Sequence, residues 1–250
     1  MKKSLKLLAF LLILSIIYII YIIYTPNPKK LNYVALGDSI AEGVNSYNAP
    51  DYGYPDYIRD YLNNNKRLGN YTKRFSKSGY RVENIINDIN DNRSVIDTNN
   101  KTITIKEALR ESNLVTISIG ANDLMGGSSI QTFATKLNNM KTTKEEVDEI
   151  VKQVEELLIL VKKYAKGQII LVGYYNPLPT ITSHKSQIDE VIIYANNKYL
   201  EIAENLEIDY VDIFELFIEH IEFLPNPSNI HPNSKGYEAM SKEVIKKINR

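Results

Sequence analysis

Short runs rich in β-branched and aromatic residues alternate along this chain with longer stretches of helical apolar periodicity, and this alternation strongly restricts the folds open to it. Parallel strands need crossover connections, usually helices, so a sheet built in this way is covered on both faces. We therefore expect an α/β domain with a five-stranded parallel sheet between two layers of helices. The expected strands are residues 33–36, 71–75, 114–119, 168–172 and 208–211.

Helical patterns fill the segments between these strands. The most regular one begins at Thr143, whose hydroxyl can cap the helix while Glu146 reaches back to the same end, and apolar residues at helical spacing continue it to a left-handed stop at Gly167. The other expected helices are residues 55–62, 82–89, 105–111, 187–205 and 235–248. The amino-acid composition does not change along residues 32–250, so these residues are expected to form one domain.

The first residues have the pattern of a membrane anchor. Lys2, Lys3 and Lys6 precede an uncharged apolar run over residues 7–24, which at about 1.5 Å per residue spans roughly the hydrocarbon core of a bilayer. No small-residue cleavage site follows the run, and the chain has no cysteine for a lipid anchor. We expect an uncleaved signal anchor, with cleavage at an unconventional site and secretion as the alternative.

This interpretation divides the chain into four parts and assigns its location. The greater positive charge before the apolar run favours an amino terminus inside the cell, with the remaining chain outside the membrane. The expected parts are a basic cytoplasmic segment at 1–6, a single-pass transmembrane anchor at 7–24, a linker at 25–31 and an extracytoplasmic domain at 32–250.

Composition excludes several kinds of function. Thirty Lys and Arg residues balance thirty Asp and Glu residues, which argues against a nucleic-acid-binding surface. The absence of cysteine excludes disulfides and thiolate metal sites, and three histidines without a shared spacing indicate no metal site. No cofactor is expected, and the oligomeric state is left open.

Polar motifs follow three of the expected strands. Ser39 comes directly after the first strand, Gly79 follows the second and Asn122 the third, while His231 precedes the last helix. In open α/β sheets a ligand binds beyond the carboxyl ends of the strands, where the strand order reverses. For the expected order 2-1-3-4-5 that point lies between strands one and three, so we expect these residues to meet at one edge of the sheet.

Ser39 and His231 together indicate a nucleophile and its base, because histidine titrates near neutrality and can take a proton from a hydroxyl. Each also has an ordinary explanation. Ser39 with Asp38 can cap a turn, and a histidine beside a proline is commonly a surface loop residue. Their shared placement at one sheet edge favours catalysis. His184 and His220 have the pattern of exposed residues.

In these motifs the chain resembles the SGNH hydrolases, also called GDSL hydrolases, a family of esterases and lipases. Four blocks of the family's pattern are similar to segments of this chain, in the family's order. They are Gly37, Asp38 and Ser39 with Gly43; Gly79; Gly120 to Asp123; and His231 with Pro232. The resemblance covers residues 32–249 and implies a flavodoxin-like three-layer α/β/α sandwich.

The resemblance also implies roles for these residues. Ser39 would attack an ester and form an acyl-enzyme, with His231 as its general base. Asp38 and Asp123 would brace their loops by accepting backbone N–H bonds rather than transfer protons. The oxyanion hole would consist of the backbone N–H groups of Ser39 and Gly79 and the side-chain amide of Asn122.

One position departs from the family's pattern, which ends Asp-x-x-His-Pro. Ser228 stands three residues before His231, where the pattern has the acid that orients the histidine and stabilises its charged form. Ser228 can orient the ring but adds no charge. We therefore expect a Ser–His dyad or an atypical triad, helped by a backbone carbonyl of residues 225–229 or by a carboxylate from elsewhere. Asp212, after the last strand, is the first carboxylate to consider, although a helix cap is its more ordinary role.

The expected reaction is hydrolysis of carboxylic esters, either lipid acyl esters near a membrane or acetyl esters of cell-surface polysaccharide. Several tyrosines and the loop at residues 174–180 could line the substrate pocket or could equally cover the sheet. The tyrosines are Tyr47, Tyr52, Tyr54 and Tyr57. Two alternatives remain open: a catalytically degenerate domain that binds esters or glycans at the cell surface, motivated by the missing acid, and an acyltransferase that uses the same serine.

Overall fold

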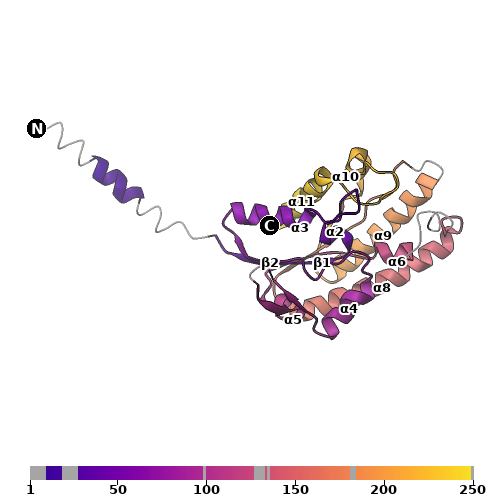
Figure 1. Cartoon of the computed structure of the whole chain (residues 1–250), viewed down its shortest axis with the longest axis horizontal. Coiled ribbons are helices and arrows are strands. Elements are labelled where there is room, and N and C mark those ends of the chain that lie inside the picture. The colour runs from indigo at the N-terminus through magenta and orange to yellow at the C-terminus, as the bar shows by residue number, and fades with distance from the viewer. Residues whose placement is uncertain are drawn as a thin grey trace, which may run out of the picture. The chain divides into compact units, whose positions relative to one another are not determined.

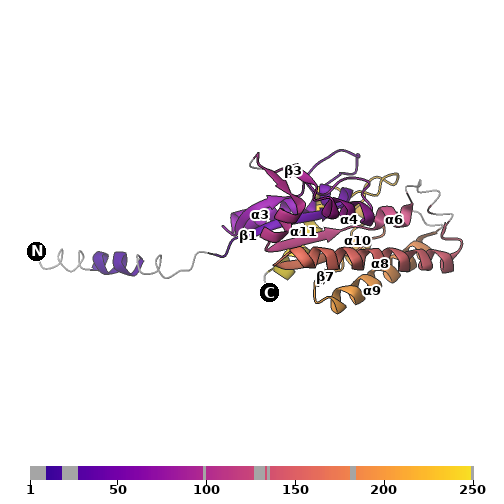
Figure 2. The ribbon, with the colours of Figure 1, turned by 90° about the horizontal axis from the view of Figure 1, so that it is seen from below.

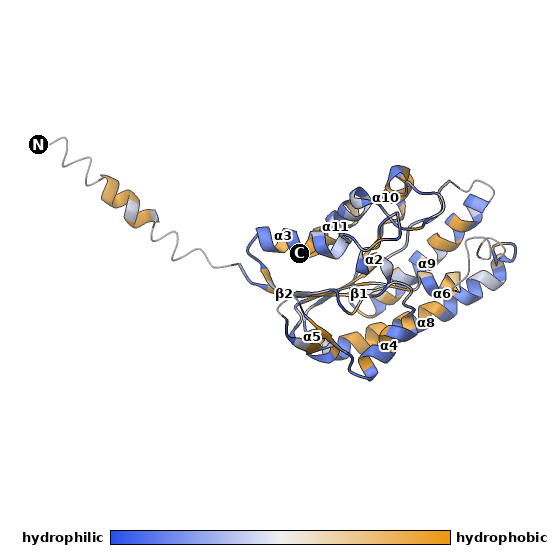
Figure 3. Ribbon diagram, in the orientation of Figure 1, coloured by the Kyte–Doolittle hydropathy of each residue, from blue (hydrophilic) through white to orange (hydrophobic). Residues whose placement is uncertain are grey.

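The computed structural model describes residues 10–18, 28–97, 100–126, 133, 136–180 and 184–248. The chain divides into two compact units, Met1–Lys30 and Leu31–Arg250, and each is described by itself. In the first unit, residues 10–18 are helical and their side chains are exposed and largely apolar (Figure 3).

Half of the expected membrane anchor lies outside the described residues, since residues 7–9 and 19–24 are not among them. Within the described part of the chain, no helix combines the length and the apolar character needed to cross a membrane. Anchoring through residues 7–24 therefore stays a prediction, as do the basic segment at 1–6 and the linker at 25–31.

A five-stranded parallel sheet forms the centre of the second unit, which confirms the expected α/β fold. Its order is β2 (Leu68–Thr72), β1 (Leu31–Gly37), β5 (Leu114–Ser118), β6 (Gln168–Val172) and β7 (Asp209–Val211). The numbering differs from the expected 2-1-3-4-5 because β3 (Ser94–Ile96) and β4 (Thr102–Thr104) form a separate antiparallel hairpin, which the sequence analysis missed.

Helices cover both faces of the sheet (Figure 1). One face carries α3 (Tyr54–Asn64) and α11 (Ser234–Ile248); the other carries α4 (Val82–Asn90), α5 (Ile105–Glu111), α8 (Met140–Tyr164) and α9 (Lys185–Asn205). The last two pack side by side (Figure 2). Successive strand residues point to opposite faces, so Val34 and Leu36 join the core under α4, α8 and α9 while Tyr33 and Ala35 join the core under α3 and α11.

The bounds of α8 correct two expectations. The helix begins earlier, with Asn139 as its N-cap, because the Asn139 side chain accepts the N–H of Thr142. Thr143 is therefore a buried residue inside the helix, and Glu146 pairs with Lys136 at 2.8 Å instead of closing a capping box. The helix ends at Tyr164, before extended backbone, so Gly167 is not its left-handed stop.

Gly167 has a packing role instead. A Cβ at this position would lie 2.0 Å from the backbone oxygen of Asn113, so only glycine allows the start of β6 to approach the start of β5 this closely. The strand expected at 71–75 is likewise displaced. It occurs at 68–72, and the chain leaves the sheet at Lys73, whose carbonyl accepts the N–H of Ser76 in a turn.

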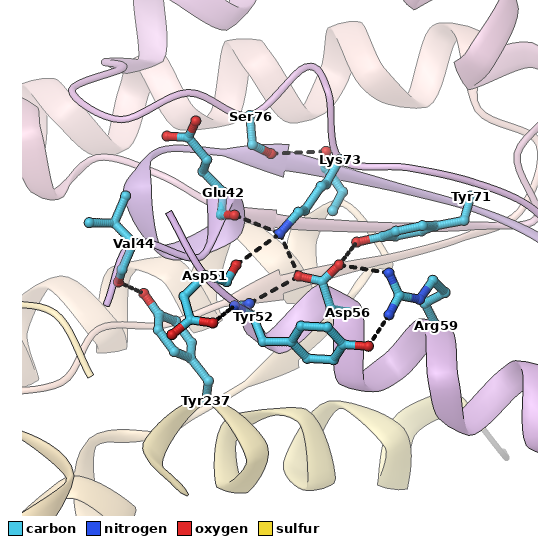
Figure 4. A network of polar contacts seen from close by, with 12 residues as sticks. Glu42, Val44, Asp51, Tyr52, Asp56, Arg59, Tyr71, Lys73, Ser76 and Tyr237 are labelled. Carbon is cyan, nitrogen blue, oxygen red and sulfur yellow. Dashed lines mark hydrogen bonds and ion pairs between the residues drawn. The ribbon is translucent and has the colours of Figure 1, made fainter. Parts of the chain in front are cut away.

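A buried ion-pair network joins the end of β2 to the start of α3 (Figure 4). Asp56 is 3% exposed and accepts hydrogen bonds from the Gly53 N–H at 3.0 Å, from the Tyr71 hydroxyl at 3.2 Å and from Arg59 at 3.1 Å. Lys73 completes the set with an ion pair to the same carboxylate.

Lys73 also fixes the segment that precedes α3. Its ammonium donates to the backbone oxygen of Glu42 at 2.7 Å and to that of Asp51 at 3.4 Å (Figure 4). The residues between these two contacts form a loop whose ends are held by one cation. The hydroxyl of Tyr237 on α11 adds a third contact, to the backbone oxygen of Val44 at 2.6 Å.

This network predicts that Asp56→Ala lowers the free energy of unfolding by about 3 kcal/mol, because it leaves two cationic groups without their shared buried partner. Glu149→Ala is the matched control, since Glu149 pairs with Lys152 on the exposed surface of α8 and its loss should change stability by less than about 0.5 kcal/mol. Urea unfolding of both variants measures the difference. Equal effects would show that the Asp56 network does not hold the fold.

Candidate active site

Ser39 lies at the first position of a short helix, α2 (Ser39–Glu42), directly beyond the carboxyl end of β1. Asp38 caps this helix: its carboxylate accepts the N–H of Ile40 at 2.9 Å, which satisfies one of the amides that a helix leaves free at its start. Asp38 and Ser39 are 3% and 5% exposed. The cap fixes the backbone from which the Ser39 hydroxyl projects.

His231 reaches Ser39 from the loop before α11. Its Nε2 lies 2.8 Å from the Ser39 Oγ, and the imidazole is buried. The hydroxyl of Tyr175, in the loop after β6, donates to the backbone oxygen of Ile230 at 2.7 Å and holds this loop against the sheet edge. Two residues that are 192 positions apart in the sequence are thereby in hydrogen-bond contact.

The second imidazole nitrogen contacts Asn229, a residue that the sequence analysis did not single out. The Asn229 Oδ1 lies 2.7 Å from the His231 Nδ1 and also accepts the backbone N–H of His231 at 2.9 Å. On the other side, the Asn229 amide nitrogen donates to the Asn48 Oδ1 at 3.0 Å. An Asn two residues before the histidine was the available signal, but the family's spacing directed attention to position 228.

Two expected supporting residues take other roles. Ser228 does not orient the ring: it is exposed, and its backbone N–H donates to the side chain of Asn226 at 3.0 Å. Asp212 is also exposed, and its carboxylate accepts the N–H of Phe214, the first residue of α10 (Phe214–Glu219), at 2.8 Å. No carboxylate among the described residues contacts the imidazole of His231.

Gly79 and Asn122 lie on neighbouring loops. Asn122 belongs to α6 (Ala121–Met125), and its amide nitrogen donates to the backbone oxygen of Tyr80 at 2.9 Å, which ties it to the residue after Gly79. Gly79 has φ +80°, a conformation that favours glycine, and a Cβ there would meet no atom within 4 Å. The backbone N–H groups of Ser39 and Gly79 have no acceptor among the described residues.

Glutamate and aspartate side chains brace both loops. The Glu42 carboxylate, at the end of α2, accepts the N–H of Ser78 at 2.6 Å and so orients the peptide that precedes Gly79. The Asp123 carboxylate accepts the N–H of Val82 at 3.2 Å, at the start of α4. These contacts connect the three loops that follow β1, β2 and β5.

Burial governs the electrostatics of the site. Burial lowers the pKa of His231 to about 4, which keeps the imidazole neutral at ordinary pH. Burial, reinforced by the charge of Asp123, raises the pKa of Asp38 to about 7, against the opposing effect of the Ile40 N–H. Burial also raises the pKa of Asp123.

A narrow cavity of about 60 Å³ opens beside Ser39. Its walls are nearly all apolar, and they come from α2, α6, α9 and the loop after β6. They include Ile40, Leu124, Met125, Phe133, Pro177 and Ile192. Tyr174 and Tyr175 of the 174–180 loop also line it.

The four other tyrosines considered as pocket walls do not line this cavity. Tyr54 is fully buried under the sheet, Tyr57 packs against the core beneath α3, and Tyr47 is 83% exposed. Tyr52 donates its hydroxyl hydrogen to Asp60 at 2.6 Å.

The remaining histidines lie elsewhere. His220 is half-buried, unlike the exposed residue expected; it pairs with Glu222 at 3.0 Å and stacks on Phe223. His184 precedes α9 and is also half-buried. Within the described residues, no group of three or more His, Cys, Asp or Glu side chains is arranged to hold a metal ion.

Comparison with known proteins identifies the family of the chain. The profile of the GDSL-like lipase/acylhydrolase family matches residues 35–239. The chain is 23% identical over 224 residues to the spore germination lipase LipC of Bacillus licheniformis, covering 86% of this chain and 94% of that protein.

Two solved structures have a similar fold. One is the lipase Lip_vut3 from a goat rumen metagenome, with a TM-score of 0.68 and 20% identity over 86% of this chain and 95% of that one. The other is a catalytic mutant of the acetylxylan esterase Axe2 from Geobacillus stearothermophilus, with a TM-score of 0.62 and 19% identity over 89% and 96%. At these identities the two structures support the fold alone.

The raised pKa of Asp38 predicts a pH-dependent stability. Its folded-state value of about 7 exceeds its value of about 3.8 in the unfolded chain, so the folded state binds more protons between these limits. The stability due to Asp38 is therefore fully present below about pH 4 and is lost as pH rises through 7. Asp38→Asn keeps the oxygen that caps α2 but removes the charge. The free energy of unfolding of this variant, relative to wild type, should therefore be higher at pH 8 than at pH 5.

Asp212→Asn is the control for this prediction, because Asp212 makes the same i to i+2 contact with the first N–H of α10 at an exposed position. Urea unfolding at pH 5 and pH 8 measures both variants, and comparison with wild type cancels the contributions of other groups. A difference between Asp38→Asn and wild type that is the same at the two pH values would contradict the raised pKa.

Proposed function

Because the chain belongs to the GDSL-like lipase/acylhydrolase family, we propose that it hydrolyses carboxylic esters with Ser39 as the nucleophile and His231 as the general base. The observation that carries this proposal is the 2.8 Å contact between the Ser39 Oγ and the His231 Nε2. The contact lies beyond the carboxyl ends of β1 and β5, and Ser39 lines an apolar cavity there, where open α/β sheets bind their ligands.

The proposed reaction has two halves. His231 takes the proton of the Ser39 hydroxyl as Oγ attacks the ester carbonyl, and it then gives that proton to the leaving alcohol, which leaves an acyl group on Ser39. In the second half His231 takes a proton from water, which attacks the acyl-enzyme and releases the acid. The low pKa of His231 keeps its Nε2 free to accept a proton at neutral pH.

Negative charge on the carbonyl oxygen is proposed to meet three donors: the backbone N–H groups of Ser39 and Gly79 and the side-chain amide of Asn122. The two backbone groups have no acceptor among the described residues, and one N–H of the Asn122 amide is not used by Tyr80. A preorganised donor of this kind typically contributes about 10² to 10³ in rate.

The cavity supports an acyl chain of a few carbons as the substrate's acid part. Nearly all of its lining is apolar, and its volume is about 60 Å³. Acetate would fill only part of this space, and a long fatty acyl chain would exceed it. A location outside a membrane, with residues 7–24 as the anchor, is consistent with a lipid-derived ester and stays a prediction.

The assigned nucleophile predicts that Ser39→Ala lowers turnover of p-nitrophenyl butyrate by about 10⁴ or more without unfolding the full-length chain. The wild-type chain, but not the variant, should react with a fluorophosphonate probe, since labelling requires an activated hydroxyl. More than a few per cent of residual activity would exclude Ser39. Silence of the folded wild-type chain in both assays would favour the binding module instead.

The cavity predicts a preference for butyrate over acetate and over palmitate among p-nitrophenyl esters. Leu124→Phe narrows the cavity and should lower the ratio of kcat/KM for butyrate to that for acetate by about tenfold, the order of effect expected for misfitting one or two methylenes. Ile159→Phe, at an exposed position on α8, is the matched control and should leave the ratio unchanged. An unaltered ratio in Leu124→Phe would place the acyl group elsewhere.

A further inference from the structure

The side chain that orients His231 is a neutral amide. Asn229 is 6% exposed, and its oxygen accepts both the Nδ1–H of the imidazole and the backbone N–H of the same histidine. The family's pattern has an acid in this role, three residues before the histidine, and Ser228 at that position is exposed and turned to Asn226.

Two contacts fix which end of the Asn229 amide faces the ring. The backbone N–H of His231 can only donate, so the atom it meets at 2.9 Å must be the amide oxygen. The amide nitrogen then points to the Asn48 Oδ1, 3.0 Å away, where it has an acceptor. An oxygen facing Nδ1 requires a proton on Nδ1, which leaves the Nε2 lone pair directed at the Ser39 hydroxyl.

Asn48 is itself held in place. It has φ +60°, in the left-handed region that asparagine tolerates better than most residues, and its N–H donates to the backbone oxygen of Asn45 at 2.9 Å. The Asn45 side chain accepts the N–H groups of Tyr47 and Ala49 and closes the turn.

Further contacts join this turn to the histidine loop and to the rest of the fold. The side chain of Asn226 donates to the backbone oxygen of Ser46 at 3.0 Å, beside the contact between Asn229 and Asn48. Tyr237 holds the turn from α11 through Val44 (Figure 4). The segment that follows the nucleophile therefore also positions the base.

The ionisable groups on the surrounding elements have other partners. Asp38 before α2 bonds to Ile40, Asp123 on α6 bonds to Val82, Tyr175 after β6 bonds to Ile230 and Tyr237 on α11 bonds to Val44. None of these groups has a contact with the imidazole, so its only oriented partners among the described residues are Ser39 and Asn229.

We propose that Asn229 is the positioning residue of the His231 base, acting through its amide oxygen on the Nδ1–H, and that Asn48 holds Asn229 in this orientation. The inference rests on the proposed function for its kinetic consequences. A neutral amide selects the tautomer and the direction of the ring, as an acid does, but supplies no charge to stabilise the imidazolium. The pKa of His231, about 4, is the expected result of a buried ring without that charge.

Two variants of the full-length chain test the proposal by their kcat for p-nitrophenyl butyrate. Asn229→Ala should lower kcat by about 10² or more, since a positioned general base contributes about 10² to 10⁴. Asn48→Gly should lower it less, because glycine keeps the left-handed turn and only the acceptor is lost. Asn113→Ala is the control and should leave kcat unchanged. The Asn113 side chain accepts the Asn32 N–H at the amino ends of the strands, away from Ser39.

A third variant, Asn229→Asp, should change the pH dependence of kcat/KM, which a purely structural role of Asn229 would leave unchanged. A carboxylate beside the ring raises the pKa of His231, so the acid limb of kcat/KM should shift from near pH 4 to above pH 5. Imidazole ¹⁵N shifts provide a second readout that needs no activity. His231 should carry its proton on Nδ1 in the wild-type chain and show a mixture of tautomers in Asn229→Ala.

The proposal is overturned if Asn229→Ala and Asn48→Gly stay within about threefold of wild type with an unchanged tautomer, or if Asn229→Asp leaves the acid limb where it is. Should Asn229→Ala fail to fold, Asn48→Gly and Asn229→Asp decide. Hydrolysis that survives Ser39→Ala contradicts the proposed function instead, and the ¹⁵N shifts then test the positioning role alone.

Discussion

The structure of the site depends on one hydrogen bond, between the Ser39 hydroxyl and the His231 imidazole. The two residues are far apart in the sequence and meet only because β1 is an inner strand of the sheet and α11 packs beside α3 on one of its faces. Each side of the bond has its own support. Asp38 caps the helix that carries Ser39, and Asn229 holds the ring of His231. A displacement of either loop by about 1 Å would break the alignment that general-base catalysis needs.

The residues that support the site are buried polar groups. The rigidity of the site depends on whether each of these groups has its hydrogen-bond partners. An unpaired buried polar group is costly, so a fully bonded one holds its neighbours in a single arrangement. Asp56 has four partners and Lys73 reaches two backbone oxygens, which together fix both ends of the segment that contains Asn48. Stability of the fold and orientation of the base are therefore linked through the same loop.

Many of the strands and helices could be predicted from the sequence, because the periodicity of apolar residues indicates directly which side chains are buried. The strand at 168–172 and the helix at 105–111 have their expected bounds. β2 was misplaced because it contains Gly69 and Asn70, which are poor strand formers; the Asn70 N–H donates there to the side chain of Asn32. The family's spacing does not indicate Asn229, and its role depends on a turn from residue 226 and on a partner 181 residues away.

A neutral partner for the base His231 changes which charges are buried in the site, and not only how well the imidazolium is stabilised. A carboxylate at position 229 would be a further buried charge in a region where burial already raises the pKa of Asp38 and of Asp123, and it would be stabilised only while the imidazole is protonated. The amide of Asn229 is bonded at both ends whether or not His231 is charged, so its burial needs no compensating ion. Hydrogen bonds that persist through the reaction thus fix the orientation of the His231 imidazole. The donors facing the carbonyl oxygen are left to stabilise the developing charge.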